Sequence, residues 1–177
     1  PEGGAYEWSG ILLQDHMGIG KGLNAAAATA FSLAMIASRL LGDRAFEKWG
    51  HVNTVKYGGY FGGGLWGICI LIGIPLSESH QTLGLIVVCT GFAAAGFGMG
   101  PFFPAFNLAA ASIPGIAPSV GLARVGLIAI ASYFGGPTLI GLIAEVTSLP
   151  IAFAFPVLLY MVVGLQSKYI KVRALKR

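Results

Sequence analysis

The side chains able to carry proton or ligand chemistry are few, and they lie within or beside long apolar stretches. Four are ionisable and one is polar: Glu2, Glu7, Arg39, Arg124 and Asn107. An ionisable group inside a bilayer costs roughly 2.5–3.5 kcal/mol on insertion scales, so groups that are retained there are candidates for function. These five residues are therefore the first candidates for a binding or proton-transfer site.

Two of these candidates also have an interfacial interpretation. Glu7 precedes Trp8, and aromatic residues gather at the headgroup level. Its carboxylate is therefore expected either at the membrane interface or in a functional cavity. Arg124 lies only a few residues into its apolar stretch, where a long basic side chain reaches back to the interface. For Arg124 we expect this interfacial role.

The composition indicates a membrane protein. Hydrophobic residues make up 55% and charged residues 10% of the 177 residues. Soluble domains carry about 25% charged residues, so this chain lacks the polar groups to cover a water-facing surface. A soluble fold would need a very large buried core, which a chain of this length does not supply.

The cysteines and histidines form no metal-binding or redox pattern. Cys69 and Cys89 lie in separate apolar runs without C-x-x-C spacing, and His16, His51 and His80 lie in different polar breaks. We therefore predict no metal site, no cofactor and no enzymatic activity. The basic excess follows the membrane topology described below, so no nucleic-acid partner is predicted.

Six apolar segments predict an all-α fold, a polytopic membrane helix bundle. In hydrocarbon the backbone must satisfy its own hydrogen bonds, so each continuous run is expected to be helical. The first segment is shorter than the roughly 20 residues that a span needs, which predicts a truncated helix in a fragment of a longer protein. The predicted segments cover approximately residues 1–13, 24–41, 54–76, 82–103, 119–144 and 149–166, followed by a basic tail over 167–177.

The Lys and Arg residues predict the orientation. The break after the second segment and its flanks contain Arg39, Arg44, Lys48 and Lys56, and the tail after the sixth segment contains five more. An even number of passes separates the two clusters, so both lie on one side, which the positive-inside rule assigns to the cytoplasm. The sequence thus predicts a multi-pass protein of the cell membrane with a cytoplasmic carboxy terminus.

Small residues recur at every fourth position in two segments. They are Ala26, Ala30, Ala34, Ser38 and Gly42 in the second segment, and Gly59, Gly63 and Gly67 in the third. Such stripes let helix backbones approach closely. Both therefore predict tight helix packing rather than a ligand site.

Glycine and proline also predict breaks within the helices. Pro101 and Pro104 are expected to end the fourth segment. Gly135, Gly136 and Pro137 are expected to interrupt the fifth near its middle and to act as a hinge.

The most specific local pattern is Ser38-Arg39-Leu40-Leu41-Gly42-Asp43-Arg44, followed by Glu47-Lys48-Trp49-Gly50. It resembles the loop motif of the major facilitator superfamily (MFS), an Arg-x-x-Gly-Asp-Arg core with a later Gly. That motif joins the second and third helices of the family and recurs, more loosely, between the eighth and ninth. The stretch Glu7-Trp8-Ser9, and the stretch from Gly135 through Pro137 to Gly141, are similar to elements of bacterial permease-like members. One departure is His51-Val52-Asn53, where the family usually has two basic residues.

The resemblance covers the whole chain and implies the carboxy-terminal six-helix half of a secondary transporter, whose two halves rock about a midplane site. In this family the helices that match the first and fourth segments line the cavity. The implied contacts for substrate or proton are Glu2, Glu7, Phe103 and Asn107, and the implied gating motif is Arg39, Gly42, Asp43 and Arg44. The implied partners are the amino-terminal six-helix half, the lipid bilayer of a bacterial inner membrane and a small-molecule substrate.

Two other classes stay open from the sequence: a non-transport membrane scaffold or receptor, and a stand-alone six-helix channel. An aquaporin-type pore would need paired Asn-Pro-Ala motifs, which the sequence lacks. Six further hydrophobic spans upstream of Pro1 would distinguish a transporter half from both. The substrate and the coupling ion are not specified by any motif.

Overall fold

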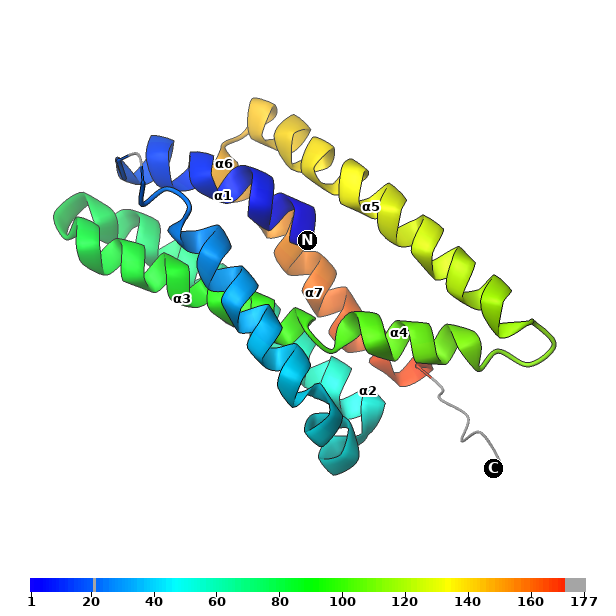
Figure 1. Ribbon diagram of the computed structural model, residues 1–177. Coiled ribbons are helices and arrows are strands. Elements are labelled where there is room, and N and C mark those ends of the chain that lie inside the picture. Colours follow the sequence, from blue (N-terminus) through cyan, green and yellow to red (C-terminus); the bar gives the residue numbers. More distant parts are fainter. Residues whose placement is uncertain (21, 171–177) are drawn as a thin grey trace.

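The computed structural model describes residues 1–20 and 22–170, and this part of the chain contains helices and no strand. Lys21 and residues 171–177 of the predicted basic tail lie outside the described residues. The helices are α1 (Glu2–Met17), α2 (Ala26–Ser79), α3 (Gln81–Met99), α4 (Phe102–Ala111), α5 (Pro118–Val146), α6 (Leu149–Ala152) and α7 (Ala154–Gln166), followed by a 3₁₀ turn, Ser167–Tyr169 (Figure 1).

Four helical stretches of the described chain are long and apolar enough to cross a membrane. They are Ala26–Ser79, Gln81–Ala111, Pro118–Val146 and Leu149–Tyr169. The all-α prediction is confirmed, and these stretches support a polytopic membrane bundle. The shorter α1 packs against this set.

A sharp bend at Gly50 divides α2 into two arms, residues 26–49 (the first arm) and residues 51–79 (the second arm). Gly50 has φ 74° and ψ 163°, a conformation that residues with a Cβ rarely adopt. The second arm runs back beside α3 (Figure 1). The sequence predicted membrane segments over approximately 24–41 and 54–76. The helices extend beyond these segments, since both arms stay helical up to the single glycine.

The glycine stripe of the second arm packs against α7. A Cβ on Gly59 would lie 2.7 Å from the Tyr160 carbonyl oxygen and 2.7 Å from the Gly164 amide nitrogen. A Cβ on Gly67 would lie 3.2 Å from a methyl carbon of Val157. The absence of side chains therefore lets the two backbones touch, as small residues do in membrane bundles. The predicted tight packing of this stripe is confirmed.

The stripe predicted for the first arm is displaced from the buried face. The buried positions are Ala27, Phe31, Met35, Ser38 and Gly42, whereas Ala26, Ala30 and Ala34 are only half-buried. The close approach comes instead from Gly96 of α3, because a Cβ there would collide with the Phe31 backbone. The predicted tight packing is thus right for Ser38, which contacts α3, whereas Gly42 is buried but has no atom within 4 Å of an added Cβ.

An aromatic cluster holds the second arm, α3 and the segment from α6 to α7 together. The buried Trp66 ring meets Phe92, Phe153 and Tyr160 edge-on, with centroid distances of 5.1, 5.7 and 5.8 Å. Edge-to-face pairs contribute about 0.5–1.5 kcal/mol each beyond burial. The Tyr160 hydroxyl donates to the Ala95 carbonyl at 2.8 Å, so its polar end is satisfied inside the core.

Of the two predicted helix breaks, the structure contains one. α3 ends at Met99, directly before Gly100 and Pro101, so the predicted end of the helix at Pro101 is confirmed. Pro104 instead lies in the first turn of α4, where the missing N–H is not needed, and the chain is helical again to Ala111. α5 continues through Gly135-Gly136-Pro137 as one helix, so no interruption is present there. Their role as a hinge stays a prediction.

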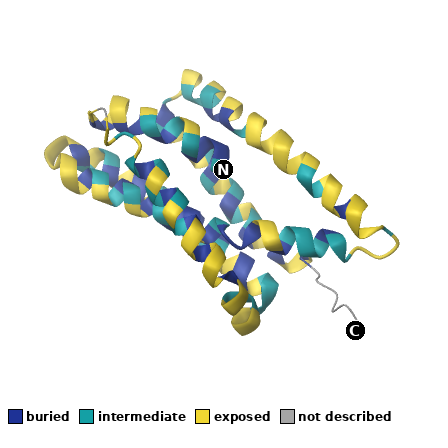
Figure 2. Ribbon diagram, in the orientation of Figure 1, coloured by how far each residue is buried: buried dark blue, intermediate teal, exposed yellow. Residues whose placement is uncertain are grey.

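α5 lies at the margin of the bundle and keeps most of its surface uncovered (Figures 1 and 2). Only 11% of an apolar 18-residue stretch of this helix is buried. Large apolar side chains such as Leu127, Ile128 and Phe134 are exposed by 71%, 67% and 71%. In water such a helix would be unstable. Its exposed face needs lipid or another protein surface.

Candidate functional site

The charged residues of the MFS-like motif lie on the last turns of the first arm, close to the Gly50 bend. Arg39, Asp43 and Arg44 are exposed, whereas Gly42 between them is buried. Arg39 and Asp43 are four residues apart on a continuous helix, so they share a face. The structure therefore brings the predicted gating residues together on one helix end and presents their charges outward.

The residues that follow the motif brace the bend. Thr54 Oγ1 donates to the Gly50 carbonyl at 2.8 Å and to the Ala45 carbonyl at 3.2 Å. The His51 ring stacks on Phe46 with a centroid distance of 4.5 Å. His51 stands where the family usually has a basic residue, and here it supports the fold of the bend. This role of His51 was not predicted from the sequence, because it depends on a contact between two rings on opposite sides of the bend.

The start of the motif is fixed to the end of α3. Ser38 Oγ donates to the Phe97 carbonyl at 2.6 Å. A Cβ on Gly100 would lie 2.6 Å from the same hydroxyl oxygen and 3.2 Å from the Arg39 amide nitrogen, so this glycine lets the end of α3 lie close against the first arm. The position of the motif's helix is thus set by α3, which continues into α4 and its polar candidate Asn107.

α1 places its two carboxylates differently. Glu2 is half-buried, whereas Glu7 is exposed on the same face as Ile11 and Gln14. The opposite face carries Ser9, which is fully buried and whose hydroxyl has no hydrogen-bond partner within the described residues. Glu7 is therefore on the part of α1 that the described chain leaves free, as either a cavity or an interfacial role requires.

The two outlying stretches that carry the MFS resemblance contact each other. Trp8 Nε1 donates to the Pro137 carbonyl at 2.9 Å. A Cβ on Gly141 would lie 2.9 Å from the Trp8 ring, so this glycine makes room for the indole. The residues after Glu7 thereby hold α1 against the proline of α5.

A second contact lies one turn away on both helices. Pro137 has no N–H and leaves the Tyr133 carbonyl without its usual helical donor. Gly3 lies against this oxygen, since a Cβ on Gly3 would be 2.8 Å from it. Gly3 and Gly141 are small residues at the helix crossing. Both glycines could be singled out in the sequence, but the residues that they contact could be identified only in the structure.

The other two cavity candidates lie on α4. Phe103 is 50% exposed, and Asn107 is half-buried. α4 packs against α5, where a Cβ on Gly121 would collide with the Ala110 carbonyl. The four cavity candidates are thus divided between α1 and α4, and both of these helices contact α5.

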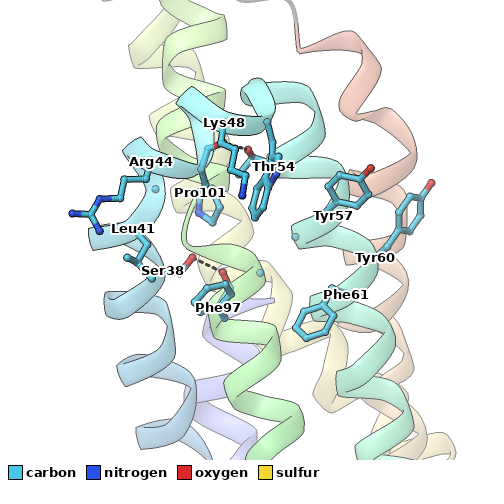
Figure 3. A pocket seen from close by; sticks show the side chains of 15 residues that line it. Ser38, Leu41, Arg44, Lys48, Thr54, Tyr57, Tyr60, Phe61, Phe97 and Pro101 are labelled. Carbon is cyan, nitrogen blue, oxygen red and sulfur yellow. Dashed lines mark hydrogen bonds between the residues drawn. The ribbon is translucent and has the colours of Figure 1, made fainter.

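A pocket of about 770 Å³ lies beside the motif, between the two arms of α2 and the end of α3 (Figure 3). Gly42 and Arg44 of the motif line it, together with apolar and aromatic side chains. Glu2, Glu7, Phe103 and Asn107 are not among its lining residues. The pocket and the predicted substrate contacts are therefore separate regions.

Comparison with known proteins identifies three relatives. The chain is 31% identical over 153 residues to an uncharacterized transporter of Sinorhizobium fredii, covering 86% of this chain and 38% of that protein. It is 28% identical over 167 residues to an uncharacterized MFS-type transporter of Yersinia pestis, covering 94% of this chain and 41% of that protein. It is 27% identical over 173 residues to the membrane protein MosC of Rhizobium meliloti, covering 95% and 39%.

The chain spans about two fifths of the length of these curated relatives. No family model matches the chain, and no solved structure matches it. Over most of its length the chain is similar to MFS-type membrane transporters, and the resemblance indicated by the Arg39–Arg44 motif is confirmed.

Proposed function

We propose that this chain is the carboxy-terminal six-helix half of a secondary active transporter that moves a small solute by alternating access. The observation that carries the proposal is similarity along 86–95% of the chain to about two fifths of longer transporters. The bend at Gly50 supports the count of six segments, because it separates the two arms of α2 into two spans.

The uncovered face of α5 supports an amino-terminal half as the partner. α5 contacts α1 near Pro137 and α4 near Gly121, and most of its remaining surface is exposed. In a transporter with two halves, such a helix lies at the interface between them. The substrate would bind between the halves, near the exposed face of α1 that carries Glu7.

The orientation in the proposal has the Gly50 bend and the carboxy terminus in the cytoplasm of a bacterial cell. Asn53 and Ser79 are both exposed and lie at opposite ends of the second arm. Twenty-six residues of helix between them extend about 39 Å, enough to cross the bilayer. Single cysteines at these positions, in the full-length protein without Cys69 and Cys89, test the orientation. Only the cysteine at Ser79 should react with an impermeant reagent from outside, and reaction at Asn53 alone would reverse the topology.

Proton coupling through Glu7 is the mechanistic part of the proposal. A carboxylate can bind and release one proton, so a carboxylate in a cavity that opens to each side of the membrane in turn can couple proton movement to transport. Glu7 would hold or release a proton as the halves rock, and substrate would bind beside it. The contact of Trp8 with Pro137 at 2.9 Å would transmit a movement of α1 to α5.

The test uses the full-length protein in proteoliposomes loaded with pyranine, a pH-sensitive dye. A panel of small solutes is added, and solute-dependent proton movement is recorded. At least one solute should produce it, Glu7→Gln should abolish it, and the matched control Glu78→Gln, at an exposed position at the end of the second arm, should preserve it. Equal proton movement in wild type and Glu7→Gln would return Glu7 to an interfacial role.

A further inference from the structure

The pocket beside the Gly50 bend has an apolar interior and a basic rim. Its walls come from the first arm, the second arm and the end of α3 (Figure 3). The side chains that form the interior are chiefly aliphatic and aromatic, among them Leu41, Trp49, Tyr57, Phe61, Phe97 and Pro101. A soluble polar molecule would find few partners in such an interior.

Two basic side chains mark the rim. The Lys48 ammonium lies 5.5 Å from the centroid of the Trp49 ring, and Figure 3 shows it reaching over the pocket. Arg44 extends away from the rim on the same arm. The neighbouring acidic residues Asp43 and Glu47 are exposed but do not line the pocket. The charge at the rim is therefore positive.

Gly42 shows that the pocket has room for a ligand. This residue is buried, yet a Cβ added to it would meet no atom within 4 Å. By contrast, a Cβ on Gly58 or Gly98, which also line the pocket, would collide with the neighbouring backbone. The glycines of α2 and α3 thus pack the floor, while the wall at Gly42 faces space that the described chain leaves free.

We propose that this pocket binds one anionic phospholipid, with an acyl chain in the apolar interior and the phosphate at Lys48, whose ammonium reaches over the pocket. An anionic amphiphile uses both parts of the site, because its acyl chain matches the apolar lining and its phosphate can pair with the exposed Lys48 ammonium. Basic residues near the membrane surface attract anionic lipids, and aromatic residues such as Trp49 and Tyr57 favour the headgroup level. The proposal requires a membrane location and does not depend on transport.

Quenching of Trp49 by brominated phosphatidylglycerol tests the site in the full-length protein in detergent. The part of the quenching that disappears in Trp49→Phe reports occupancy of the pocket, since Trp49 is a lining residue. We expect stronger quenching by the brominated phosphatidylglycerol than by brominated phosphatidylcholine. Lys48→Gln should weaken the apparent affinity for phosphatidylglycerol about fivefold, the effect expected for one basic residue near an anionic surface.

Two matched variants separate the parts of the proposal. Gly42→Leu places a side chain in the open space, and it should abolish quenching at Trp49 by both lipids. Lys168→Gln removes an exposed basic residue of the 3₁₀ turn outside the pocket and should leave binding unchanged.

Three outcomes would overturn the proposal. The first is equal quenching by the two lipids, and the second is an effect of Lys168→Gln as large as that of Lys48→Gln. The third is displacement of the brominated lipid by glycerol phosphate, which has no acyl chain, at the same concentration as by unlabelled phosphatidylglycerol. That last result would identify a site for a soluble phosphate instead.

Discussion

The glycine contact between the second arm and α7 gives the sharpest prediction about stability. At Gly59 the nearest atoms to an added Cβ are the backbone of Tyr160 and Gly164, at 2.7 Å. Backbone atoms cannot rotate out of the way. In Gly59→Ala the two helices must therefore move apart. If the neighbouring atoms belonged to a flexible side chain, that side chain could rotate away instead.

The magnitude follows from the distance and from a matched control. Ordinary contacts of a Cβ begin near 3.4 Å, so the helices must separate by about 0.7 Å, and overpacking of this kind costs roughly 1–3 kcal/mol. Gly64 lies on the same arm, and its added Cβ would meet only the flexible end of Met161 at 3.5 Å. Both substitutions gain about 0.5–1 kcal/mol from replacing glycine within a helix. The difference between the two variants is therefore the packing cost itself.

The assay is unfolding of the full-length protein in detergent with increasing dodecyl sulfate, followed by circular dichroism. Gly64→Ala should unfold at the same or a higher denaturant fraction than wild type. Gly59→Ala should unfold at a lower one, with a free energy of unfolding about 1–3 kcal/mol below that of Gly64→Ala. If the two variants coincide, the backbone contact at Gly59 does not limit the separation of these helices, and the packing argument is refuted.

Three further predictions concern the bend, the contact of α1 with α5, and the gating motif. Gly50→Ala forces a side chain into the conformation at φ 74° and ψ 163° and should destabilise the protein by about 1–3 kcal/mol in the same unfolding assay, with Gly64→Ala as control. Trp8→Phe removes the 2.9 Å hydrogen bond to the Pro137 carbonyl and should cost about 0.5–1.5 kcal/mol, whereas Trp49→Phe at an exposed position should change stability by less than about 0.5 kcal/mol. If the exposed Asp43 carboxylate pairs with a partner in the other half when the cytoplasmic side is closed, Asp43→Asn should shift the full transporter toward its inward-facing state, because the substitution removes that charge. Unchanged cysteine accessibility on both membrane sides in Asp43→Asn would make Asp43 an ordinary surface charge.

The sequence by itself determined the class of the protein. A chain with 10% charged residues and long apolar runs must place its backbone in helices, because the bilayer offers no hydrogen-bond partners. The motif from Arg39 to Arg44 was likewise visible in the sequence, since it depends on residue types at fixed spacing. The glycine stripe at Gly59, Gly63 and Gly67 predicted close packing for the same reason.

Only the tertiary structure decided which surfaces those residues meet. Proline and glycine lower the cost of a break but do not require one, so α5 stays helical at Pro137 where Gly3 and Trp8 cover its carbonyls. The bend falls at Gly50 because the second arm packs back on α3, which calls for a backbone conformation that only glycine adopts readily. The pocket at Gly42 depends on the separation of the two arms. Such separations are set by contacts between residues far apart in the chain, so they cannot be predicted from the spacing of neighbouring residues in the sequence.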